Sequence, residues 1–386
     1  MSLDTLSVQD FLTALNWNPE KNRERVPGQS EFPYGNRVAL ISPPQAGKTA
    51  TVSGLFMRAQ QKVRETVYTD TPFYCRVLEG GSNIHQDISN LMSGYFPAKT
   101  RSYLGFRSSP GLLLEQKKFL NLEVPLTGKI FGHNIGRKQQ LWHKMLQLPI
   151  CDLPGETLTQ VMWQVRALKS QAQIEATKEI IENAIIEMRE SDAFIFILKA
   201  STAMGLGEQL ESEHDSTISR DPDVNLTRMF EDIVQHKTEQ GRQIKRSFIA
   251  ITAWDKLARR AERLNFNILD PYIGRQTMED FVAACYPQFY AAMHSSLRSE
   301  QIDYYPLYFQ TEKDDKGNEI LFKDKIEYRD ETGALGLKDV ERPHIIVKDA
   351  FNSPQNIWEN VRKIQYSIVG YDRLLNDVMK LAEAAR

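Results

Sequence analysis

Residues 37 to 49 read Arg37-Val38-Ala39-Leu40-Ile41-Ser42-Pro43-Pro44-Gln45-Ala46-Gly47-Lys48-Thr49, an apolar run that leads into a loop ending in Gly-Lys-Thr. The next residues, from Ala50 to Met57, have the pattern of a helix. A strand, a Gly-Lys-Thr loop and a helix in this order are typical of a phosphate-binding loop. In such a loop backbone N–H groups surround a phosphate, Gly47 permits close approach, Lys48 bridges phosphates and the Thr49 hydroxyl holds Mg²⁺. The alternative is a surface turn that carries these letters by chance.

The composition is that of a globular protein. The 386 residues include 48 basic and 50 acidic side chains, and the formal net charge of −2 gives no general attraction to nucleic acid or anionic lipid. No run approaches the roughly 18 apolar residues of a membrane span, and the N-terminus lacks the pattern of a signal peptide. The three cysteines, Cys75, Cys151 and Cys285, form neither a disulfide framework nor a metal-ligand spacing. We therefore expect a cytoplasmic protein.

Strands and helices alternate along most of the chain, which predicts an α/β fold with a mostly parallel sheet. Continuous apolar runs indicate buried strands, and alternation with period two indicates a hairpin. The expected strands are 193–198, 246–252 and 304–310, with a hairpin formed by 118–124 and 144–151. The expected helices are 158–190, 226–240 and 354–385, and residues 98–118 have the composition of a loop.

The same patterns divide the chain into an N-terminal extension, residues 1–35, and one domain, residues 36–386. Within that domain, segments at about 67–118, 201–224 and 313–335 are longer than the alternating pattern requires, so we interpret them as insertions, the last one as a β-hairpin. The domain ends in the helix expected over 354–385.

Two further motifs stand at the ends of expected strands. Asp152-Leu153-Pro154-Gly155-Glu156 follows the hairpin, where an acid can reach Mg²⁺ through water and a Gly amide can contact a γ-phosphate. A plain turn is the alternative, because Asp, Pro and Gly are turn residues. The second motif, Thr252-Ala253-Trp254-Asp255-Lys256, ends the strand at 246–252. There the Asp255 carboxylate can accept two hydrogen bonds from N1 and the 2-amino group of guanine.

With these three motifs in this order, residues 36 to 312 resemble the P-loop GTPases of the translation-factor-like (TRAFAC) class. The Asp-Leu-Pro-Gly stretch resembles that of dynamin-like GTPases, and the surrounding sequence is similar to bacterial and archaeal accessory or conflict-system GTPases. The resemblance implies a P-loop NTPase fold, a three-layer α/β/α sandwich with one antiparallel hairpin strand in the sheet. It also implies GTP or GDP with Mg²⁺ as cofactors. The residues implied to bind nucleotide are Ser42, Pro43, Pro44, Gln45, Ala46, Gly47, Lys48, Thr49, Ala50, Gly155, Thr252 and Asp255.

Three departures from the family pattern bear on activity. Ser42 replaces the first Gly of the loop, a position that does not require a positive φ. Thr252-Ala253 replaces Asn-Lys, so Thr252 can still tie to the phosphate-binding loop, but the Lys stem that packs on the base is missing; Trp254 or Lys256 would supply the stacking surface. Glu156 stands where many hydrolytic members have Gln or His. A carboxylate can orient water but repels the γ-phosphate, so we expect slow hydrolysis.

Two positions rest on the family order alone. Thr100, in Phe96-Pro97-Ala98-Lys99-Thr100-Arg101, lies where the switch threonine closes over Mg²⁺ and the γ-phosphate. Thr311 lies where the family carries a short loop beneath the base. Lys48, Glu156 and Thr100 are therefore the catalytic candidates, and Thr49, Asp152 and Thr100 the metal ligands.

The sequence thus predicts a GTPase that acts as a slow molecular switch on protein partners through its insertions. A nucleotide-binding scaffold with little hydrolysis and an ATPase or nucleotide kinase remain as alternatives. The partner is unknown, a homo-oligomer is left open, and the sequence has no strong nucleic-acid signal and no membrane span.

Overall fold

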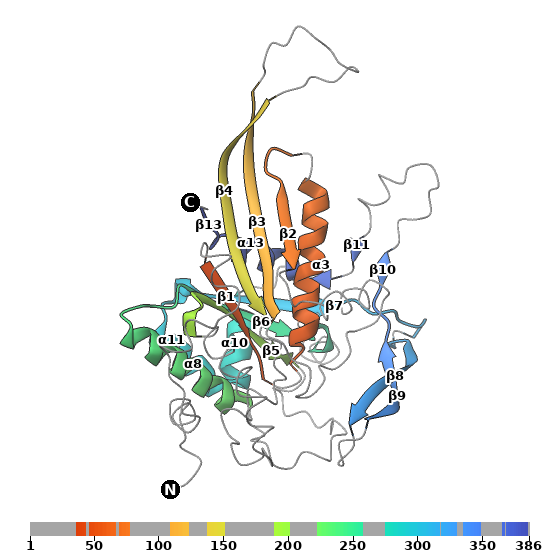
Figure 1. Ribbon diagram of the computed structural model, residues 1–386. Helices are drawn as coiled ribbons and strands as arrows, with labels where there is room; N and C mark the ends of the chain where they lie inside the picture. Colours follow the sequence, from red (N-terminus) through yellow and green to blue (C-terminus); the bar gives the residue numbers. More distant parts are fainter. Residues whose placement is uncertain are drawn as a thin grey trace, which may run out of the picture.

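The computed structural model describes residues 36–43, 46–66, 69–77, 109–122, 137–150, 189–200, 222–257, 275–316, 318–329, 335–348, 365–366 and 368–384. Figure 1 shows a central sheet with helices on both of its faces. Among the described residues no helix is long and apolar enough to cross a membrane.

Nine strands of the described chain form one sheet. Eight of them follow the order β12 (Ile368–Val369), β7 (Ile302–Phe309), β6 (Arg246–Thr252), β5 (Ala193–Lys199), β1 (Asn36–Ile41), β4 (Arg137–Ile150), β3 (Ser109–Leu122) and β2 (Phe73–Val77), and β13 (Glu383–Ala384) pairs with β4. The pairings from β7 through β6, β5 and β1 to β4 are parallel. Those of β4 with β3, β3 with β2, β7 with β12 and β4 with β13 are antiparallel. The predicted mostly parallel sheet with an antiparallel hairpin is confirmed.

Helices cover the two faces of this sheet and make the fold a three-layer sandwich. One face packs against α3 (Lys48–Thr66) and α13 (Tyr371–Met379), and the other against α8 (Pro222–Glu239), α10 (Arg275–Cys285) and α11 (Pro287–Ser296). Along β5, Ile195 and Ile197 belong to the first core, whereas Phe194, Phe196 and Leu198 belong to the second. Because a central strand is buried on both faces, a continuous apolar run marks it, as the sequence predicted.

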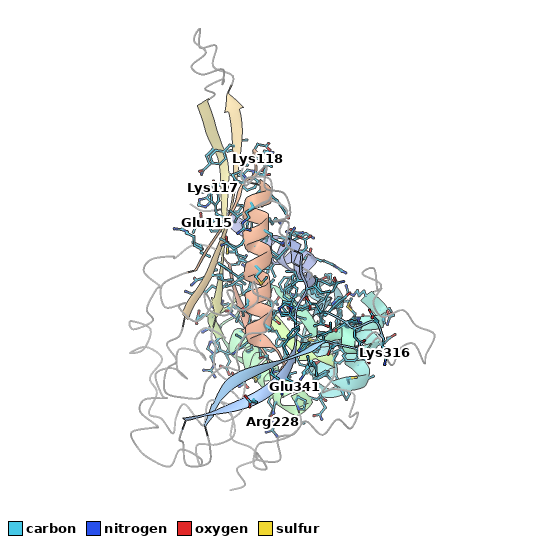
Figure 2. All side chains as sticks on the ribbon, turned by 90° about the vertical axis from the view of Figure 1, so that its right-hand side faces the viewer. Glu115, Lys117, Lys118, Arg228, Lys316 and Glu341 are labelled. Carbon is cyan, nitrogen blue, oxygen red and sulfur yellow. The ribbon has the colours of Figure 1, made fainter. Side chains whose placement is uncertain are left out.

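The β3–β4 hairpin is longer than predicted and extends beyond the neighbouring strands in Figure 1. The assignment of residues 98–118 to a loop is wrong from residue 109 onward, where β3 begins. Leu112, Leu113 and Leu114 are all buried, so this part of the strand lacks the alternation that indicates a half-exposed strand. β2, which the sequence analysis had not assigned, adds to the edge formed by β3, so the segment 67–118 contributes two strands to the sheet. In Figure 2 the hairpin stands beside α3, with Glu115 and Lys117 on β3.

A second hairpin follows β7 and confirms the prediction of a β-hairpin in this part of the chain, with shifted bounds. Its strands are β8 (Leu321–Arg329) and β9 (Leu335–Pro343). The base of the hairpin is joined to the chain after β7 by an isolated bridge between Thr311 and Ile345. The remaining short elements are the 3₁₀ helices η2 (Trp254–Leu257) and η4 (Ser299–Gln301) and the strand pair β10 (Val347–Lys348) with β11 (Gln365–Tyr366).

The single C-terminal helix expected over 354–385 is wrong. The helix α13 covers only Tyr371–Met379 and lies between the short strands β12 and β13. Gly370 has a φ of +86° immediately before it, a left-handed conformation that an uninterrupted helix would exclude. α13 packs closely on α3, because a Cβ placed on Gly54 would lie 2.5 Å from the ring of Tyr371.

Candidate functional site

The turn after β1 joins a strand to a helix, which is the order of elements that the sequence analysis expected for this segment. β1 ends at Ile41, the Ala46 N–H donates to the Pro43 carbonyl at 3.4 Å, and α3 begins at Lys48. Gly47 has a φ of +85°, which is why glycine is needed there. The first turn of a 19-residue helix therefore points its N–H groups and the positive end of its dipole at this edge of the sheet.

The predicted residues of this loop divide into two groups. Ser42 and Pro43 are buried at the strand end, and Lys48 is 7% exposed. Ala46, Gly47 and Ala50 line a cavity, and Thr49 is half-buried beside them at the start of α3. Pro44 and Gln45 lie outside the described residues.

Thr252 makes the contact to this loop that the sequence predicted. Its hydroxyl donates a hydrogen bond to the Ala46 carbonyl at 2.7 Å and shares it with the Leu198 carbonyl at 3.0 Å. A Cβ placed on Gly47 would lie 3.6 Å from the same hydroxyl. The end of β6 therefore contacts the loop and holds it in place.

Replacing Thr252 by valine is expected to destabilise the protein by about 1–3 kcal/mol, because two buried carbonyls lose a shared donor while the side-chain shape is kept. Chemical unfolding of the purified variant measures this. Thr252→Ser retains the hydroxyl and is expected to lose less stability than Thr252→Val. Equal losses in the two variants would mean that the hydroxyl does not matter.

A cavity of about 350 Å³ opens at the carboxyl edge of the parallel strands. This volume lies at the lower end of the range for small-molecule sites, and this edge of an α/β sheet is where such sites form. The loop and the ends of β5, β6 and β7 all contribute to it, together with the second hairpin and α13. The lining residues are Ala46, Gly47, Ala50, Thr51, Lys199, Thr252, Ala253, Asp255, Leu307, Tyr308, Phe309, Thr311, Glu319, Pro343 and Tyr371.

Beyond β6 the chain turns sharply, and this turn separates the side chains of Trp254 and Asp255, which the sequence analysis had placed together in the site. Ala253 has a φ of +53°, a conformation that costs energy for a residue with a Cβ. After this turn Asp255 lines the cavity. Trp254 is only 1% exposed, meets the Phe281 ring edge-on at a centroid distance of 5.3 Å and does not line the cavity.

The prediction that Trp254 offers a stacking surface in the site is therefore wrong, because its ring belongs to the core beneath the site. The side chain of Lys256, the other residue considered for this role, lies outside the described residues.

Two charged side chains that the sequence analysis had not selected also line the cavity. Lys199 ends β5 and pairs in register with Thr252 on β6. It is the first charged residue after the apolar run of that strand, which is a signal that the sequence did contain. Glu319 accepts a hydrogen bond of 3.0 Å from the hydroxyl of Thr311. No sequence motif pointed to it.

Burial and the nearby Asp255 carboxylate raise the pKa of Tyr308, which also lines the cavity. Burial likewise raises the pKa of Tyr371, whose hydroxyl shares a hydrogen bond with Thr51. The Thr51 hydroxyl in turn donates to the Gly47 carbonyl at 3.0 Å. Both tyrosines are therefore neutral, and α13 is connected through Thr51 to the loop.

Four further predicted residues, Thr100, Asp152, Gly155 and Glu156, lie outside the described residues. Within the described ranges, no group of three or more His, Cys, Asp or Glu side chains is arranged to hold a metal ion.

No family model and no curated protein matches the chain. Among solved structures it is similar to the S. cerevisiae Ski7 GTPase-like domain bound to GTP, with 12% identity and a TM-score of 0.29. The same domain bound to GDP and inorganic phosphate gives 10% identity and a TM-score of 0.28. Each match covers 71% of this chain and 43% of that chain, so this chain spans less than half the length of those neighbours.

Proposed function

We propose that the chain binds a guanine nucleoside triphosphate in this cavity and acts as a slowly hydrolysing GTPase switch on protein partners. The observation that carries the proposal is the cavity itself. It extends from Gly47 in the loop to Asp255 beyond β6, and the hydroxyl of Thr252 joins these two parts. One end therefore suits phosphates and the other suits a base with N–H donors.

At the phosphate end, the N-terminus of α3 and Lys48 would neutralise the triphosphate. Mg²⁺ would be held by Thr49 and, through water, by Asp152. Thr49 is half-buried at the start of α3, which suits a hydroxyl ligand beside bound phosphate. When bound, Mg²⁺ would neutralise charge on the phosphate oxygens. The assignments of Thr100, Gly155 and Glu156 to the γ-phosphate and the attacking water belong to the same proposal and follow from the resemblance to TRAFAC-class GTPases.

At the base end, an ionised carboxylate only accepts hydrogen bonds. Guanine offers adjacent donors at N1 and the 2-amino group, whereas the corresponding edge of adenine has an unprotonated N1 and no 2-amino group. Asp255 therefore favours guanine over adenine, which distinguishes this proposal from an ATPase or an adenine nucleotide kinase.

Asp255→Asn is expected to reverse the base preference from guanine to xanthine. The amide NH₂ would face one guanine donor, and the amide oxygen would accept from the other without a negative charge, so GTP affinity should fall about 100-fold. Xanthosine triphosphate has a carbonyl in place of the 2-amino group and should bind the variant better than GTP does. Competition against a fluorescent GTP analogue measures both affinities.

Asp339→Asn is the matched control, because Asp339 is exposed on β9 and does not line the cavity. It should leave GTP affinity unchanged. The guanine assignment would be wrong if ATP displaced the fluorescent analogue from the unmodified protein as well as GTP does.

A further inference from the structure

The cavity contains a second carboxylate in addition to Asp255. Glu319 precedes β8 and is half-buried. Its carboxylate accepts a hydrogen bond from the Thr311 hydroxyl, with 3.0 Å between the two oxygens. Thr311 itself is 7% exposed, and both residues line the cavity. The base of the second hairpin thus brings an acidic group into a site that is otherwise built from the strand ends of the sheet, α3 and α13.

Glu319 is held in place by the backbone on both sides of Thr311. The Ile320 N–H donates to the Glu312 carbonyl at 3.0 Å, and the Glu312 N–H donates to the His344 carbonyl at 2.9 Å. The Ile346 N–H donates to the Gln310 carbonyl at 2.9 Å. Three short segments therefore form a ladder that fixes the position of the carboxylate before any ligand enters, which reduces the entropy cost of binding to it.

A ligand that fills the cavity must offer hydrogen-bond donors to Glu319. A carboxylate has about four acceptor positions, and Thr311 occupies one of them. When a ligand displaces water, acceptor positions left unfilled cost free energy because the charge loses its solvation. The cavity of about 350 Å³ therefore selects a molecule with donors in two places, one for Asp255 and one for Glu319.

We propose that Glu319 is a specificity-determining residue that accepts hydrogen bonds from the ribose hydroxyls of the bound nucleotide. This inference rests on the proposed function, in which Asp255 takes the donors of the guanine edge. Two carboxylates cannot share that edge without repulsion. Apart from the second N–H of the 2-amino group, which belongs to the same edge of the base, the donors of guanosine that remain are the 2′- and 3′-hydroxyls, so the site selects ribonucleotides over 2′-deoxyribonucleotides.

The test compares GTP, 2′-deoxy-GTP and inosine triphosphate, which lacks the 2-amino group, on the full chain. The unmodified protein should bind GTP about tenfold more tightly than 2′-deoxy-GTP, the effect of one hydrogen bond to a charged group. Glu319→Ala should bring this ratio close to one and leave the ratio of GTP to inosine triphosphate unchanged. Glu319→Gln keeps the shape and one acceptor, and should give an intermediate ribose ratio even if the alanine variant folds poorly.

Glu341→Ala is the matched control, because Glu341 is exposed on the same hairpin, where Figure 2 labels it, and does not line the cavity. It should behave as the unmodified protein. The ribose contact would be overturned if both Glu319 variants kept the unmodified ratio of GTP affinity to 2′-deoxy-GTP affinity. It would also be overturned if the variants lost the preference for GTP over inosine triphosphate instead. In both of those cases the protein still binds GTP, so the proposed function stands. If the unmodified protein and Glu341→Ala both fail to bind GTP, the proposed function is wrong, and so is this inference.

Discussion

Lys48→Ala is expected to reduce the affinity for guanosine triphosphate at least about 100-fold, because the ammonium would lose charge-assisted hydrogen bonds to two phosphates, each contributing about 1.5–3 kcal/mol. Lys48 is the first residue of α3 and follows Gly47, whose positive φ turns the chain into the helix. The loss should be smaller for guanosine without phosphates, since the base contacts proposed for Asp255 would be untouched. Titration calorimetry with both ligands measures the two affinities.

Lys316→Ala provides the control for a lost lysine, because Lys316 is exposed beyond β7, where Figure 2 labels it, and lies outside the loop between β1 and α3. Lys48 is 7% exposed, so a thermal unfolding curve must accompany the binding data to separate lost contacts from lost structure. If a folded Lys48→Ala protein binds the triphosphate normally, the Gly-Lys-Thr sequence does not bind phosphate and the prediction is wrong.

Gly370→Ala is expected to destabilise the protein by at least about 3 kcal/mol, from a strained backbone and an overpacked contact together. Gly370 has a φ of +86°, and a Cβ at this position would collide with the carbonyl oxygen of Pro306. Pro306 lies inside β7, which pairs with β6 on one side and β12 on the other, so the backbone there cannot easily shift. The midpoint of thermal unfolding should fall by about 4 °C or more.

Gly241→Ala separates the two causes. Gly241 also has a positive φ, +65°, but a Cβ there would meet no atom within 4 Å. That variant should lose only about 1 kcal/mol, the cost of the left-handed conformation for a residue with a Cβ. Equal destabilisation of the two variants would show that the contact with Pro306 contributes nothing.

The parts of the fold that could be predicted are those whose burial leaves a local pattern. β6 was predicted with its observed bounds, and β5 within one residue, because a strand covered on both faces is apolar throughout. The contact of Thr252 with the loop could also be predicted, since parallel strands end at one edge of a sheet and bring their following residues together.

The parts that could not be predicted depend on contacts between distant segments. The leucines at the start of β3 have neither the alternation of a half-exposed strand nor the polar composition of a loop. They form a strand because they pair with β4, which follows later in the chain. α10 and α11, between β6 and β7, were not assigned, although their buried residues complete the second core. Trp254 was placed in the site because an aromatic residue beside a base-binding motif suits stacking, whereas the turn at Ala253 directs it into the core. Glu319 reaches the cavity only because the hairpin folds back on Thr311.

The packing of α13 against α3 affects how the polypeptide is made as well as how it is held. Arg58 on α3 forms an ion pair with Asp372 on α13, and the two residues are 314 positions apart. While a ribosome is still translating the intervening segment, the side of α3 around Gly54, where the Tyr371 ring packs, has no helix to lie against. Contacts of such long sequence separation slow folding. The docking of α13 onto α3 is therefore expected to be a late step in the folding of this polypeptide.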